Sequence, residues 1–206
     1  MIDKGNLFGA YNFVNKCLSN NLKPILGVEI NVIYKDLNYP INLLVKSDLG
    51  YKNLCKIVSI ANRFKSEGVD FKLLSLYAQD IICILSSEDS LLAFYLENNM
   101  IFEANEFLND IKKTFKDSFL GVYRYQGHNK ERLNNLIAYA NNSKLISIAM
   151  QYATHKTSKD TIIINLLDAI GKNIKANKDF LSNPSIVEAY LKNNSDLNVY
   201  YEKEEI

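Results

Sequence analysis

The stretch Ile81-Ile82-Cys83-Ile84-Leu85 is a continuous run of apolar residues. Asp80 precedes this run, and the polar residues Ser86-Ser87-Glu88 follow it. A short apolar run between polar residues is typical of a strand that is buried on both faces of a sheet. Such strands occur mainly in parallel sheets, so we predict a strand at 81–85 with parallel neighbours.

Segments of helical and of strand character alternate on both sides of this run. Branched and aromatic residues predict further strands at 24–34, 40–46, 119–124 and 144–150, the first two of which should pair or lie close. Apolar residues at helical spacing predict helices at 8–18, 50–64, 71–77, 89–97, 101–115, 130–140 and 160–170. This order of elements predicts an α/β domain with a mainly parallel sheet.

The two ends of the chain depart from the pattern. Residues 1–3 lead straight into a helix with no strand before it, so we expect the first strand and helix of the domain to be missing or to lie upstream. We expect the α/β domain to span residues 1–177. Residues 178–206 should form a C-terminal helical segment, with a short helix at 184–191, and an exit linker with a charged end.

Composition excludes several classes of protein. The 206 residues include 24 basic and 23 acidic ones, which is too little excess positive charge for strong sequence-independent binding to DNA. No apolar run reaches the roughly 18 residues of a membrane span, so we expect no contact with a membrane. Cys17, Cys55 and Cys83 lack the paired spacing of a zinc or redox motif, and no leader sequence is visible, so we expect a cytoplasmic protein.

Few residues offer catalytic chemistry. The two histidines, His128 and His155, lie in polar segments, where a solvated side chain is the ordinary interpretation. Asp3 and Glu29 lie at the ends or edges of strands, where α/β domains place ligands, although an acid beside a glycine turn is more often a cap. There is no nucleophile elbow and no glycine-rich phosphate loop, so no active site is visible from local sequence.

Four motifs in the first quarter of the chain resemble a known family. They are Ile2-Asp3-Lys4-Gly5-Asn6-Leu7-Phe8-Gly9-Ala10, Lys23-Pro24-Ile25-Leu26-Gly27-Val28-Glu29, Leu43-Leu44-Val45-Lys46 and Gly50-Tyr51-Lys52-Asn53-Leu54. In this order they resemble the PHP (polymerase and histidinol phosphatase) domain of bacterial DNA polymerase III alpha subunits, and the resemblance covers most of residues 2–190. It implies a distorted seven-stranded β/α barrel whose strand ends hold metal ions. In active members this centre hydrolyses phosphoesters, including the 3′ end of DNA.

The ligand positions that the resemblance implies are mostly altered here. Lys4 and Pro40 stand where the family has histidines, Ser86-Ser87-Glu88 replaces a Ser-Gly-Cys turn, and Tyr152-Ala153-Thr154 replaces Asp-Val-His. Glu29 is the one ligand position that is clearly retained, and a His-x-His strand would lie upstream of Met1. Since an ammonium group repels cations and a single carboxylate cannot hold several, we expect no bound metal, no cofactor and no catalytic residue.

Three functions remain open at this stage. The first is a non-catalytic PHP-like segment of a replicative DNA polymerase, with residues 178–206 leading toward the polymerase core. Its partners would be the other domains of the polymerase chain and replisome subunits, with DNA bound through the parent protein. Nucleotidyl transfer itself would belong to that parent, because it needs paired aspartates on a palm.

The other two functions need no polymerase. One is a metal-dependent phosphoesterase or 3′–5′ exonuclease that binds zinc or manganese through a non-standard set, namely Asp3, Glu29, Glu88, His128 and His155. The other is a free-standing α/β interaction module that is unrelated to replication.

Overall fold

The chain forms two compact units. The computed structural model describes residues 1–63, 68–125, 128–175, 189–198 and 201. The first unit comprises Met1–Gly121 and Asn134–Ser147, and the second comprises Val122–Leu133 and Ile148–Ile206. The domain boundary predicted after residue 177 lies within residues 176–188, outside the described residues.

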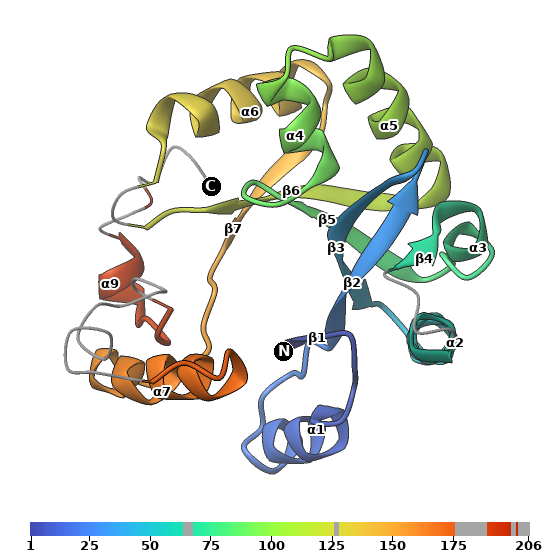
Figure 1. The fold of residues 1–206 in the computed structure, drawn as a ribbon. Coiled ribbons are helices and arrows are strands. Elements are labelled where there is room, and N and C mark those ends of the chain that lie inside the picture. Colours follow the sequence, from blue (N-terminus) through green and yellow to red (C-terminus); the bar gives the residue numbers. More distant parts are fainter. Residues whose placement is uncertain (64–67, 126–127, 176–188, 199–200, 202–206) are drawn as a thin grey trace. The chain divides into compact units, whose positions relative to one another are not determined.

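A single sheet organises the fold, as the sequence predicts for an α/β protein. Within the described residues its strands are β1 (Ile2–Lys4), β2 (Gly27–Tyr34), β3 (Leu37–Val45), β4 (Val69–Asp70), β5 (Ile81–Ser86), β6 (Asp117–Tyr123) and β7 (Ile146–Met150). They follow the order β1-β2-β3-β5-β6-β7, and β4 pairs with β2, which gives seven strands among the described residues (Figure 1). The α/β class of the PHP-like prediction is confirmed.

The sheet is more mixed than predicted. β1 and β4 run parallel to β2, and β5 runs parallel to β6, but β3 is antiparallel to both β2 and β5. The strand at 81–85 therefore has a parallel neighbour on one side only. The cause is a tight hairpin between β2 and β3, in which Lys35 and Asp36 have φ values of 47° and 66°. Two successive positive φ values are typical of the type I′ turn, which reverses the chain between adjacent strands.

The expectation that no strand precedes the first helix is wrong. Residues Ile2–Lys4 form β1, which pairs with β2 in the register Ile2↔Gly27, Asp3↔Val28 and Lys4↔Glu29. The terminal ammonium group of Met1 donates a hydrogen bond of 2.7 Å to the carbonyl oxygen of Ile25, and burial lowers the pKa of this amine. Three residues are too few to show a period, and their pairing with a distant strand leaves no mark in the local sequence.

The predicted helices are present with small shifts of their ends. They are α1 (Ala10–Ser19), α2 (Asp48–Arg63), α3 (Phe71–Ser75), α4 (Leu91–Glu97), α5 (Ile101–Thr114), α6 (Lys130–Asn142) and α7 (Thr161–Gly171), which a 3₁₀ turn at Ser158–Asp160 precedes. A short helix that the sequence did not predict, α9, spans Asn194–Asn198. None of the described helices is long and apolar enough to cross a membrane.

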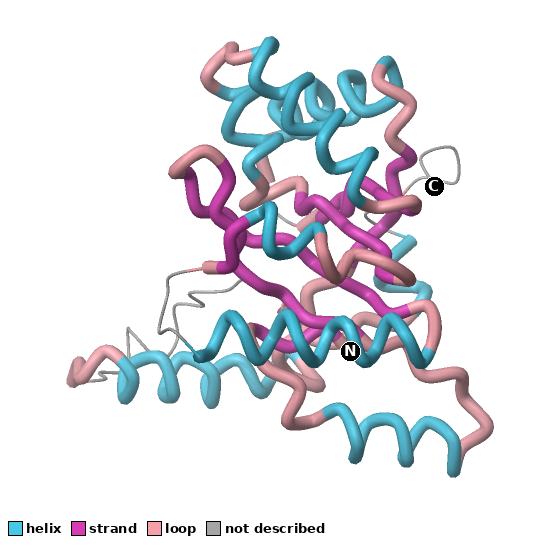
Figure 2. The backbone as a smooth tube through the Cα atoms, turned by 90° about the vertical axis from the view of Figure 1, so that its right-hand side faces the viewer, coloured by secondary structure: helices cyan, strands magenta, loops and turns pink. Residues whose placement is uncertain are grey.

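Much of the apolar core of the first unit lies on one face of its sheet. The buried side chains of Val28, Leu43 and Cys83 stand in register on β2, β3 and β5 and form its centre. Further along β2, the ring of Tyr34 packs edge-on against Phe71 of α3 and Phe107 of α5. Helices α3 and α5 therefore pack on this face, which we call the core face; Figure 2 distinguishes the helices (cyan) from the strands (magenta).

Tyr201, the last described residue of the chain, is hydrogen-bonded within the second unit. Its buried hydroxyl lies 2.9 Å from the carbonyl oxygens of both Val122 and Met150, at the ends of β6 and β7. The same oxygen accepts a hydrogen bond of 3.1 Å from the backbone N–H of Arg124. The predicted helix at 184–191 lies largely outside the described residues, and Tyr190 forms a parallel bridge with His155.

Candidate functional site

The opposite face of the first unit's sheet carries several positions at which the resemblance places metal ligands. The register aligns Lys4 of β1 with Glu29 of β2, and Glu29 with Asn42 of β3. Pro40 lies two residues before Asn42 on β3 and therefore shares its face. We call this the ligand face. Positions 4, 29 and 40 lie together there, although two of the three side chains have changed.

Lys4 and Glu29 form an ion pair on the ligand face. The Nζ atom of Lys4 lies 3.1 Å from Oε1 of Glu29, with side chains that are 68% and 24% exposed. Backbone contacts support the pair, because the N–H of Gly5 donates to the carbonyl oxygen of Glu29 at 2.8 Å. Asn62 of α2 in turn donates to the carbonyl oxygen of Gly5 at 2.8 Å. The carboxylate at the retained ligand position is thus already neutralised by an ammonium group.

Asp3 lies on the other side of the sheet. Its partner in the register is Val28, a buried core residue, and neighbouring residues of a strand point to opposite faces. Its Oδ2 atom would lie 3.3 Å from a Cβ atom built on Gly9, so the carboxylate sits beside the start of α1. Asp3 and Glu29 therefore cannot ligate the same ion.

The turn Ser86-Ser87-Glu88 follows β5. The hydroxyl of Ser86 accepts hydrogen bonds from the backbone N–H groups of Glu88 at 3.0 Å and Asp89 at 3.4 Å, which stabilises the turn. Ser86 shares the ligand face, because it lies two residues beyond Ile84, which is aligned with Asn42. Since β3 lies between β2 and β5, however, the backbones at Glu29 and Ser86 are separated by at least ~10 Å.

Asn42 is the residue of this face that the sequence reasoning missed. Its side chain is buried although it is polar, and it stands beside Glu29 in the register. The signal in the sequence is one amide within the otherwise apolar strand 40–45. An uncharged amide adds no charge to the ion pair of Lys4 and Glu29, so it does not restore a cation site.

His155 belongs to the second unit, where its ring and its backbone form hydrogen bonds with other segments. Its Nδ1 atom lies 2.9 Å from the hydroxyl of Thr154, and its Nε2 atom lies 3.0 Å from the hydroxyl of Thr161 at the start of α7. The backbone carbonyl of His155 also accepts a hydrogen bond of 2.9 Å from Leu191. With both ring nitrogens hydrogen-bonded, this imidazole has no lone pair directed at a metal.

The remaining predicted positions of the second unit are also engaged. The Nδ1 atom of His128 lies 2.6 Å from the carbonyl oxygen of Tyr125. The segment Tyr152-Ala153-Thr154 follows β7, and Thr154 donates its backbone N–H to the carbonyl oxygen of Ala189 at 2.8 Å. At the positions where the resemblance implies a ligand motif, this segment instead forms a backbone hydrogen bond with Ala189.

The donor set does not fit the metal centre that the resemblance implies. Among the described residues, no three His, Cys, Asp or Glu side chains lie close enough to one another to hold a metal ion. The carboxylate of Glu29 is paired with Lys4, and Asp3, which precedes Lys4 in the sequence, points to the other face. A multinuclear centre needs several anionic or imidazole donors around each ion, and this face does not supply them.

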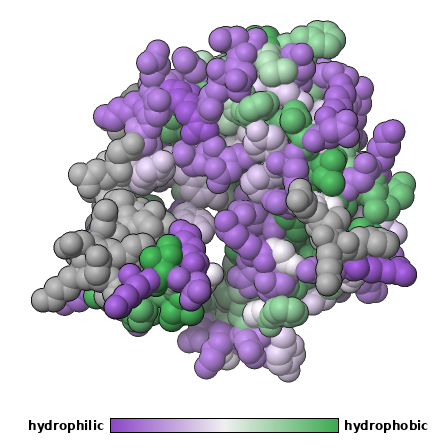
Figure 3. Space-filling model, in the orientation of Figure 1, coloured by the Kyte–Doolittle hydropathy of each residue, from purple (hydrophilic) through white to green (hydrophobic). Residues whose placement is uncertain are grey.

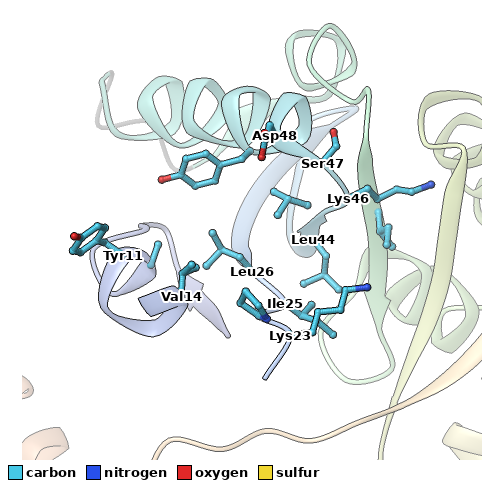
Figure 4. A pocket seen from close by; sticks show the side chains of 14 residues that line it. Tyr11, Val14, Lys23, Ile25, Leu26, Leu44, Lys46, Ser47 and Asp48 are labelled. Carbon is cyan, nitrogen blue, oxygen red and sulfur yellow. The ribbon is translucent and has the colours of Figure 1, made fainter. Parts of the chain in front are cut away.

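A cavity of about 760 Å³ opens beside the ligand face, at the start of β2. Its walls come from α1, from residues 23–26, from the end of β3 and from the start of α2, and Figure 4 shows Leu26 and Leu44 between the two helices. Two polar groups at its rim are engaged. Lys46 pairs with Asp117, a hydrogen bond that raises the pKa of this lysine, and Ser47 donates to Asp80 at 2.6 Å. The walls of the cavity are mainly apolar.

Comparisons with known proteins agree with this architecture. The PHP domain model matches residues 1–124. DNA polymerase III subunit alpha of Aquifex aeolicus is 27% identical over 191 residues, which is 82% of this chain and 16% of that protein. The corresponding protein of Borreliella burgdorferi is 24% identical over 213 residues, which is 96% of this chain and 19% of that protein.

A shorter and stronger match is found in Streptococcus pyogenes. Its DNA polymerase III subunit alpha is 42% identical over 57 residues, which is 28% of this chain and 6% of that protein. The chain therefore spans less than a fifth of the length of these relatives. With a match over residues 1–124 and an α/β sheet that keeps the ligand positions on one face, this chain belongs to the PHP domain family.

Proposed function

We propose that this chain is an architectural PHP-like segment of a replicative DNA polymerase and has no hydrolytic activity of its own. The observation that carries the proposal is the ion pair of Lys4 and Glu29, with 3.1 Å between Nζ and Oε1. An ammonium group takes the place of a ligand and pairs with the retained carboxylate. Without bound metal, no water is activated and no leaving oxygen is stabilised.

The proposed partners follow from the relatives. These are DNA polymerase III alpha subunits in which more than four-fifths of the polypeptide lies outside the matched segment. We propose that this chain packs against other polymerase domains and contributes to DNA replication in the cytoplasm. DNA would be bound through the polymerase, because a net charge of +1 gives this chain little excess positive charge for sequence-independent binding to DNA.

An exonuclease assay tests the absence of activity. The purified chain is incubated with a 5′-labelled primer–template in zinc or manganese, with and without EDTA. We expect the length of the primer to be the same with the protein as without it. Glu29→Gln is the matched control, because a contaminating nuclease would act equally in both preparations. Shortening that EDTA abolishes and Glu29→Gln removes would overturn the proposal in favour of a metal-dependent phosphoesterase.

A second assay tests the architectural role. DNA synthesis by the source organism's DNA polymerase III alpha polypeptide is measured with the intact segment and with Leu43→Asp, which places a charge in the core of the first unit. We expect synthesis to fall with Leu43→Asp and to stay unchanged with Glu29→Gln. Equal synthesis with Leu43→Asp and with the intact segment would contradict an architectural contribution.

A further inference from the structure

Helix α1 has an apolar side that the rest of the first unit covers only in part. The residues at the spacing of one helical face are Ala10, Phe13, Val14 and Cys17. Only Ala10 among them is buried, and the other three are half-buried. In Figure 3, the visible surface of α1, at the bottom of the view, is mostly hydrophilic. Since Ala10 and Val14 line the cavity of about 760 Å³, the apolar side of α1 borders an open space instead of a packed core.

Other walls of this cavity are aliphatic as well. They include Leu26, which is 6% exposed, and the half-buried side chains of Leu44 and Ile82. The volume of the cavity lies within the range of about 300–1,000 Å³ that is typical of small-molecule sites. Half-buried aliphatic side chains are stabilised when an apolar ligand removes them from water. These walls therefore fit a hydrocarbon group.

A positive charge lies at one end of these walls. Figure 4 shows Lys23 below Leu26 and Leu44, and Asp48 above them. Lys23 forms no hydrogen bond or ion pair with any other residue that the structure describes, so its ammonium group can pair with an anion. An anionic group at Lys23 is also kept apart from the carboxylate of Asp48. The cavity thus combines apolar walls with an ammonium group at one end.

We propose that this cavity binds a fatty acid, with the carboxylate at Lys23 and the hydrocarbon chain along Leu26 and Leu44. Charge and apolar walls together match a ligand that has one anionic end and one aliphatic end. Such a site is independent of the architectural role proposed above.

A helix of a partner protein or of a second copy fits this cavity less well. A helix with its side chains is about 10–12 Å wide, so a volume of about 760 Å³ holds only about one and a half turns. Recognition of a helix in a groove uses side chains that are spread over about two turns. An extended hydrocarbon chain is narrower and can lie in the cavity along its whole length.

A chain-length series tests the apolar part of the site. The purified chain is titrated with octanoate, decanoate and dodecanoate, each below its critical micelle concentration, in an isothermal titration calorimeter. The dissociation constant should fall about fourfold for each added CH₂ group. Decylamine, which has a chain of the same length as decanoate but a cationic head, should bind about tenfold more weakly than decanoate. Equal affinities for the three carboxylates, or heat without saturation, would overturn the proposal.

Substitutions test the position of the ligand. Lys23→Met should weaken decanoate binding about three- to fivefold, because it removes an exposed ammonium group. The matched control is Lys16→Met, an exposed lysine of α1 outside the cavity, which should leave the affinity unchanged. Val14→Trp fills the cavity and should weaken binding at least tenfold. Thermal unfolding of each variant verifies that the fold is intact.

The other results of these substitutions contradict the proposal. Unchanged affinity in Lys23→Met would mean that the carboxylate lies elsewhere. Unchanged affinity in a folded Val14→Trp would place the ligand outside this cavity. Flotation of the unaltered chain with phosphatidylglycerol vesicles, lost in Val14→Trp and without binding of free decanoate, would assign the cavity to a membrane lipid instead.

Discussion

The two faces of the first unit's sheet have opposite properties. On the core face, Val28, Leu43 and Cys83 stand in register and are fully buried, and burial raises the pKa of the Cys83 thiol. On the ligand face, one register row contains a lysine, a glutamate and an asparagine. The comparison teaches that, in this chain, the strands keep their pairing and their buried core face although two of the three ligand positions on the other face carry residues that differ from those the resemblance implies.

The largest expected loss of stability comes from a substitution on the core face. Leu43→Ala removes a fully buried side chain and should lower the free energy of unfolding by about 2–5 kcal/mol. Its neighbour Leu44 points to the ligand face and is only partly buried, so Leu44→Ala should cost about 1 kcal/mol. Urea unfolding followed by circular dichroism measures both. Equal losses would contradict the assignment of the two faces.

A smaller loss is expected where α2 approaches the chain before β5. A Cβ atom on Gly50 would lie 2.1 Å from the backbone oxygen of Asp80, so Gly50→Ala should destabilise the protein by about 1–3 kcal/mol. Gly171, at the end of α7, has no atom within 4 Å of a built Cβ atom and provides the control. Thermal unfolding should show a lower midpoint for the first variant alone. A midpoint lowered equally by Gly171→Ala would refute this contact.

Tyr34 tests a polar group at the edge of the core face. Its hydroxyl donates a hydrogen bond of 2.8 Å to Oδ2 of Asp110, and Tyr34→Phe should cost about 1 kcal/mol at neutral pH. Burial, followed by this hydrogen bond, raises the pKa of Tyr34 above its usual value of 10.0. The neutral form is therefore favoured in the folded state, and its stabilisation is present below pH 10 and is lost as the pH rises further.

Measuring stability at two pH values tests the raised pKa of Tyr34, with Tyr11→Phe as the control. Unfolding by urea at pH 9 and at pH 11 should show the unaltered protein losing more stability than Tyr34→Phe over that interval. Tyr11→Phe, at an exposed position, should lose as much as the unaltered protein. Parallel losses in Tyr34→Phe and the unaltered protein would show that the phenol titrates as it does in water.

The smallest effect belongs to the ligand face. Lys4→Met and Glu29→Gln each break an ion pair whose lysine is 68% exposed, and each should change the free energy of unfolding by less than about 1 kcal/mol. A double-mutant cycle isolates the interaction of the pair, and added salt should reduce it. A coupling of several kcal/mol would mean that the ligand face stabilises the fold as much as the core face does.

The sequence predicted most elements because their patterns are local. The apolar run at 81–85 and the helical spacing at 101–115 correspond to β5 and α5 within a residue or two. It did not predict β1, a strand of three residues that depends on pairing with β2. It also missed the direction of β3, because the turn at Lys35 and Asp36 lacks the glycine or asparagine that usually marks a type I′ hairpin.

The ligand face was less accessible to sequence reasoning. The resemblance indicated which positions matter, and alternation along the strands then placed positions 4, 29 and 40 together. The ion pair of Lys4 with Glu29 and the burial of Asn42 depend on the parallel register of β1 with β2, which no local pattern reveals. The hydrogen bonds that engage both ring nitrogens of His155 depend equally on tertiary structure.

The metal content of the purified chain tests the central claim most directly. The protein is loaded with zinc and manganese, dialysed, and analysed by inductively coupled plasma mass spectrometry, with Glu29→Gln as the matched control. Since Lys4 neutralises the retained carboxylate, we predict well under one equivalent of either metal, with no difference between the two proteins. Two or more equivalents in the unaltered chain, reduced in Glu29→Gln, would contradict the account.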